Sequence, residues 1–122
     1  MKTTKNDNYY LEKMLFYIDF IMQYFENLKR KNLVLRPNDQ YSDGIAYKFI
    51  QLKEEAKNLS NELLFNNFKL AKHISLLNGF RNRLTHDYES VQYRFFYEII
   101  ENDLPDLKKE IIKILEENKV FM

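Results

Sequence analysis

Residues 81–88 form the densest group of side chains in this chain that can do chemistry, and they read RNRLTHDY. Histidine, with an unperturbed pKa of about 6.5, can take up or release a proton near neutral pH. A guanidinium can pair with a phosphate through two parallel hydrogen bonds. These residue types suit attack by a ribose 2′-OH on the adjacent phosphate, because the reaction needs a proton acceptor and a cation that stabilises the developing charge. The segment therefore predicts RNA cleavage without a metal ion.

The polar side chains of this segment can be given separate roles in that reaction. His86 is the candidate general base or acid, and Arg81 is the candidate partner of the phosphate. Asn82 would position a neighbouring group, Arg83 would assist or hold the RNA backbone, and Tyr88 would stack on a base or donate a hydrogen bond. On an ideal helix, His86 lies about 140° around the axis from Arg81. We therefore expect the helix to end near His86, so that the imidazole can turn toward Arg81.

Composition limits the kinds of protein that can carry this segment. The chain has 122 residues, 45% of them hydrophobic, with 2 Gly, 2 Pro and no Cys. This favours one domain built from a few long helices, and it excludes disulfides and thiolate metal sites. The formal net charge is +1, so RNA must be contacted through a local patch. We find neither a signal sequence nor a stretch of about 20 apolar residues, which predicts a cytoplasmic protein that does not enter a membrane.

Apolar residues recur at helical spacing along most of the chain, which predicts an all-α, antiparallel bundle of four main helices. Residues 1–8 are expected to be frayed, and residues 60–71 are ambiguous. Pro105, after Asn102 and Asp103, predicts a kink or short break in the C-terminal helix. The four helices are expected at about 9–31, 42–59, 69–85 and 90–117, within a single domain spanning 1–122.

The first of these helices carries an unusually broad apolar face made of two adjacent stripes. A face this wide exceeds what one neighbouring helix covers, so the helix should lie centrally in its bundle or bury part of itself against a second subunit. The stripes are Tyr10, Met14, Tyr17, Ile21, Tyr24 and Leu28, and Leu11, Leu15, Ile18, Met22 and Phe25.

The pattern Arg-x-x-x-x-His-x-Tyr, formed by Arg81, His86 and Tyr88, resembles the motif of HepT-like ribonuclease toxins of the HEPN superfamily. Asn82 is similar to the polar residue that follows the arginine in HEPN ribonucleases. The resemblance extends roughly from Tyr9 to Leu115, and the flanking segments 55–60 and 103–107 also look like those of the family. The chain departs from common members because it has no Trp, whereas a tryptophan often precedes the arginine.

The resemblance implies a specific function for the chain. It implies a homodimer whose two motifs face each other across one RNA cleft, acting as an endoribonuclease toxin of a type II/VII-like toxin–antitoxin pair on tRNA or mRNA. The implied partner is a minimal (MNT-type) nucleotidyltransferase antitoxin that transfers AMP to Tyr88. A bulky anion there would block the cleft. The resemblance also makes Glu55 a candidate cleft residue, and it implies no cofactor.

Two other functions remain open at this stage. The chain could be a non-enzymatic HEPN module that binds a substrate or nucleotide for a partner nucleotidyltransferase, or a plain dimeric scaffold in which residues 81–88 are only a helix end. For His73, we expect a solvated helix face, because two histidines without clustered carboxylates do not make a metal site.

Overall fold

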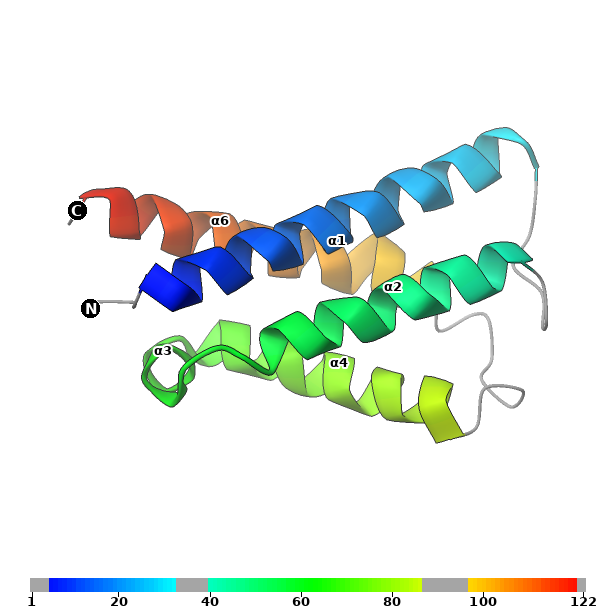
Figure 1. Cartoon of the computed structure of the whole chain (residues 1–122). Coiled ribbons are helices and arrows are strands. Elements are labelled where there is room, and N and C mark those ends of the chain that lie inside the picture. Colours follow the sequence, from blue (N-terminus) through cyan, green and yellow to red (C-terminus); the bar gives the residue numbers. More distant parts are fainter. Residues whose placement is uncertain (1–4, 33–39, 87–96, 121–122) are drawn as a thin grey trace.

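The computed structural model describes residues 5–32, 40–86 and 97–120, with side chains for 6–32, 43–79 and 97–119. Figure 1 shows long helices lying alongside one another and a short one, α3, at one end. The described parts of the chain contain no β-strand, which confirms the all-α class. In chain order the elements are α1 (Lys5–Arg30), α2 (Gln40–Ala56), α3 (Asn61–Asn66), α4 (Phe68–His86), the π-helix η2 (Ile99–Asp103) and α6 (Leu104–Val120).

One hydrophobic core joins these helices. Leu11, Met14 and Ile18 of α1 are fully buried, and α1 packs against both α2 and α6. Six apolar residues at helical spacing, running from α2 into α3, are buried in this core. These are Ile45, Phe49, Leu52, Ala56, Leu59 and Leu63.

The broad apolar face of α1 is only partly used by this core. Six of its residues are buried, and five others are partly buried at its margin. The helix α1 therefore lies centrally in the bundle of its own chain, which is one of the two arrangements expected from its broad apolar face. The buried set is Leu11, Met14, Ile18, Ile21, Phe25 and Leu28, and the marginal set is Tyr10, Leu15, Tyr17, Met22 and Tyr24.

The start of α1 corrects the expected boundary. The helix begins at Lys5 instead of Tyr9, and the Asp7 side chain is only 1% exposed. Its Oδ1 accepts a hydrogen bond from Ser60 N at 2.8 Å, and its Oδ2 accepts one from Ser60 Oγ at 2.6 Å. Asn8 Oδ1 accepts a hydrogen bond from Asn118 Nδ2 at 2.7 Å. These contacts hold the first turn against α3 and α6, so residues 5–8 are ordered instead of frayed.

Ser60 also resolves the ambiguous region 60–71. Its backbone is extended, and its Oγ accepts a hydrogen bond from Leu63 N at 3.1 Å, which makes Ser60 the N-cap of α3. Asn67 ends α3 and Phe68 starts α4 at once. The region is therefore a short capped helix followed directly by a long one.

The expected irregularity before Pro105 takes the form of a π-helix. Leu104 N donates to Ile99 O, five residues back, and α6 continues from Leu104. Proline has no N–H to donate, so the carbonyl that would normally receive its hydrogen bond is released and the helix widens locally. Beside this irregularity, Lys29 Nζ of α1 lies 3.0 Å from Glu101 Oε1 in an exposed ion pair. Residues 90–96, where the fourth helix was expected to begin, lie outside the described part of the chain.

Candidate active site

The motif segment occupies the last turns of α4. Residues 81–86 are helical, and His86 is the last residue of α4 that the structure describes. Arg81, Asn82, Arg83 and His86 therefore lie on one regular helix, whereas Asp87 and Tyr88 fall outside the described residues. The backbone places this segment at the end of the bundle where α1 ends and α2 begins (Figure 1).

Helical geometry decides which motif residues share a face of α4. Asn82 and His86 are four residues apart, so their Cα atoms lie about 40° apart around the axis. Arg81 and His86 are five apart, or about 140°. Because the helix runs through His86 itself, the backbone of one chain does not bring Arg81 and His86 onto one face. A cleft that uses both residues needs either long side chains that wrap around the helix end or a second chain.

Glu55 lies away from the motif within one chain. It is near the C-terminal end of α2, which runs antiparallel to α4, so Glu55 and His86 are at opposite ends of the bundle (Figure 1). Its Oε1 lies 3.6 Å from Lys13 Nζ, and its side chain is 17% exposed. The structure therefore places Glu55 in the contact between α1 and α2.

His73 differs from its expected position on a solvated face. Its side chain is half-buried, and Nδ1 has no hydrogen-bond partner. It lines a groove of about 520 Å³ between α4 and the junction of η2 and α6. Burial raises the pKa of the Asp103 carboxyl in this groove, while the nearby His73 acts in the opposite direction. Sequence reasoning missed this proximity because the two residues are 30 positions apart and lie on different helices.

The groove beside His73 carries mixed charge. Its rim holds three lysines and three carboxylates, and its floor is apolar. Among the residues that the structure describes, no group of three or more His, Asp or Glu side chains is placed to hold a metal ion. The rim residues are Lys69, Lys72, Lys109, Asp103, Asp106 and Glu110. In the same described ranges, no helix is long and apolar enough to cross a bilayer.

Comparison with known proteins assigns the family. The family described as "Ribonuclease HepT-like" matches residues 14–114, which takes in most of α1, the motif and most of α6. A protein of Caldanaerobacter subterraneus subsp. tengcongensis with the name "Putative RNase TTE0752" is 28% identical over 111 residues, covering 90% of this chain and 95% of that protein. No solved structure matches the chain at a significant level. The chain belongs to the HepT-like ribonuclease family.

Proposed function

We propose that this protein is a metal-independent endoribonuclease toxin that cuts tRNA or mRNA in the cytoplasm. The observation that carries the proposal is the motif itself, which begins in the last described turns of α4 in a chain that the ribonuclease family matches from residue 14 to residue 114. His86 acts as general base or acid on the 2′-OH and the leaving oxygen, and Arg81 stabilises the charge on the phosphate. Asn82 and Arg83 position the RNA beside them.

The active unit in this proposal is a homodimer with one composite cleft. Support comes from α4, because the helix places Arg81 and His86 about 140° apart on one chain. Two motifs facing each other would let Arg81 of one copy work with His86 of the other. Doubling the arginines would also give a basic cleft to a chain whose formal net charge is only +1.

The proposed partner is a minimal nucleotidyltransferase antitoxin that transfers AMP from ATP to the Tyr88 hydroxyl and releases pyrophosphate. Tyr88 follows His86 by two positions, so a nucleotide attached there would add a negative charge and considerable volume beside the catalytic groups. The antitoxin would thus keep RNA out of the cleft while the toxin stays folded.

Growth after induced expression tests the toxin directly. We expect wild type to arrest growth and His86→Ala to be harmless at equal soluble levels. Arrest by both variants would remove His86 from the mechanism. Normal growth with both would favour the binding module that presents a ligand to a nucleotidyltransferase.

Co-expression of two inactive variants tests the composite cleft. Arg81→Ala and His86→Ala, carrying different affinity tags, form mixed dimers that hold one intact Arg81 and one intact His86 on different chains. We expect purified mixed dimers to cleave RNA well above either parent homodimer. If they are as inactive as the parents, Arg81 and His86 do not act across the interface.

A further inference from the structure

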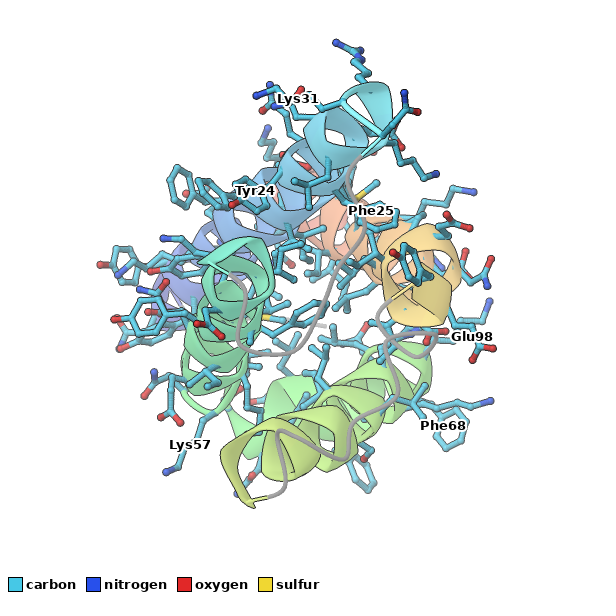
Figure 2. All side chains as sticks on the ribbon, turned by 90° about the vertical axis from the view of Figure 1, so that its right-hand side faces the viewer. Tyr24, Phe25, Lys31, Lys57, Phe68 and Glu98 are labelled. Atoms are coloured by element: carbon cyan, nitrogen blue, oxygen red, sulfur yellow. The ribbon has the colours of Figure 1, made fainter. Side chains whose placement is uncertain are left out.

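Aromatic and lysine side chains cover the outer side of α1 and α2, away from the core. Tyr9, Phe16 and Tyr47 are 54%, 64% and 60% exposed, and Phe20 is 39% exposed. Figure 2 shows ring side chains along this side of the two helices, where Tyr24 is labelled. We call this the aromatic–lysine surface, and it consists of Tyr9, Lys13, Phe16, Phe20, Tyr47 and Lys48.

The spacing on α1 explains why these residues share one side. Residues 9, 13, 16 and 20 recur at intervals of four and three, so they form a stripe along a helix. This stripe lies opposite the buried stripe that contains Leu11 and Ile18. The exposed aromatic residues are therefore not part of the core, and their apolar area is left to water.

The two lysines join the surface across the contact between α1 and α2. Lys48 Nζ lies 4.8 Å from the centre of the Phe20 ring and 5.5 Å from that of Tyr17. Lys13 Nζ lies 5.2 Å from the centre of the Tyr9 ring. The pKa of Lys13 is raised mainly by a hydrogen bond with the Tyr9 side chain and also by the negative charge of Glu55. Each lysine therefore lies beside an exposed ring.

We propose that the aromatic–lysine surface binds single-stranded RNA. This proposal rests on the proposed function only because it takes RNA as the substrate. Aromatic rings stack on unpaired bases of any type, and interleaved cations pair with the phosphates between them. The four exposed aromatic residues and two lysines offer both contacts on one face.

A second copy of the chain fits this surface less well. A two-fold interface presents the same patch from both partners, so two copies of Lys13 and two of Lys48 would be buried in one interface, with a Glu55 carboxylate beside each Lys13. Burying these cations together would cost free energy, whereas the phosphates of RNA neutralise them. The charge of the surface therefore favours a polyanion with stacking bases.

The surface is separate from the motif. It lies on α1 and α2, whereas the motif ends α4, and α2 packs against both of the other helices. RNA held there leaves the motif free, so the surface should contribute to affinity more than to the chemical step.

Direct binding of an RNA that cannot be cut tests this role. The probe is a short, fluorescently labelled 2′-O-methyl RNA, which lacks the attacking hydroxyl, and the measurement is anisotropy with the full chain. We expect Phe16→Ala and Tyr47→Ala each to weaken binding roughly five- to hundredfold, the range found for one stacked base. Lys48→Gln should weaken binding and reduce its dependence on salt.

Phe65→Ala is the matched control, because Phe65 is 88% exposed but lies on α3, outside the surface. It should bind the probe like wild type. Unchanged binding in Phe16→Ala, Tyr47→Ala and Lys48→Gln would overturn the proposal. If binding is unchanged and these variants also shift from dimer to monomer in sedimentation, the proposal is overturned and the surface is a protein interface. Because the probe cannot be cut, its binding is measured without the chemical step, so failure of this proposal can be distinguished from failure of the ribonuclease proposal.

Discussion

At the scale of single residues, the buried carboxylate of Asp7 is a strong local determinant of the fold. It accepts hydrogen bonds from both the backbone N–H and the hydroxyl of Ser60. Hydrogen bonds to a charged group contribute more to stability than neutral ones, and removing the acceptor leaves buried donors unpaired. The sequence gives no sign of this pairing, because the two residues are 53 positions apart.

Replacing Asp7 by Ala should therefore lower the free energy of unfolding by about 2–3 kcal/mol in urea denaturation. The control is Asp19→Ala, which removes an exposed ion pair in which Asp19 Oδ1 lies 2.6 Å from Lys108 Nζ. Pairs of this kind contribute about 0–1 kcal/mol. Equal effects of the two substitutions would show that Asp7 does not stabilise the first turn of α1 as described.

Asp103 should make stability depend on pH in the opposite sense to a paired carboxylate. Burial raises its pKa in the folded chain, so the folded state holds the proton more tightly than the unfolded state. The stabilising contribution of the protonated form is present below the unfolded pKa and is lost as the pH rises through the folded pKa.

Asp103→Asn keeps the shape of the side chain and removes this titration. We expect the variant to be more stable than wild type at pH 7, with the difference disappearing in acid, when thermal unfolding is followed across the pH range. Glu116→Gln, which changes an exposed carboxylate farther along α6, serves as the control. A variant that is less stable than wild type at pH 7 would show that the charged form of Asp103 is favoured in the fold.

At the scale of the elements, the short helix α3 depends on its cap. Ser60 Oγ accepts from Leu63 N and donates to Asp7 Oδ2, so one hydroxyl connects the start of α3 to the start of α1. Loss of an N-cap serine costs about 0.5–2 kcal/mol. Ser60→Ala should destabilise the chain by about that amount in urea denaturation.

A double-mutant cycle then measures the connection between the two helices. Because Asp7 and Ser60 share a hydrogen bond, the double variant should be less destabilised than the sum of the two single variants. Strict additivity would mean that the cap and the carboxylate act independently.

The elements also show what helical spacing predicts and what it misses. The apolar residues Ile45, Phe49, Leu52, Ala56, Leu59 and Leu63 recur at helical spacing, and all six are buried. On α1, the two stripes expected from spacing contain Ile18 and leave out Phe16, and Ile18 is fully buried whereas Phe16 is 64% exposed. The spacing does not show that the side opposite these stripes carries several exposed aromatic residues for a use other than the core.

At the scale of the whole molecule, the candidate site could be predicted in type but not in assembly. The residue types of the 81–88 segment point to RNA chemistry because histidine and arginine suit proton transfer and phosphate binding. The sequence does not show how Arg81 and His86 would come together, because the single helix separates them by about 140° around its axis. A relation between chains has no periodic signal in the sequence of one chain.

Cleavage of RNA by the purified protein tests the central claim most directly. Wild type and His86→Ala would be incubated with labelled tRNA and mRNA fragments in excess EDTA, after both are shown to be folded and of equal size in solution. We expect wild type to cut and leave 2′,3′-cyclic phosphate or 3′-phosphate ends, as attack by a 2′-OH requires, and His86→Ala to leave the RNA intact. Equal cutting by the two proteins, or cutting that EDTA abolishes, would contradict a metal-independent ribonuclease that depends on His86.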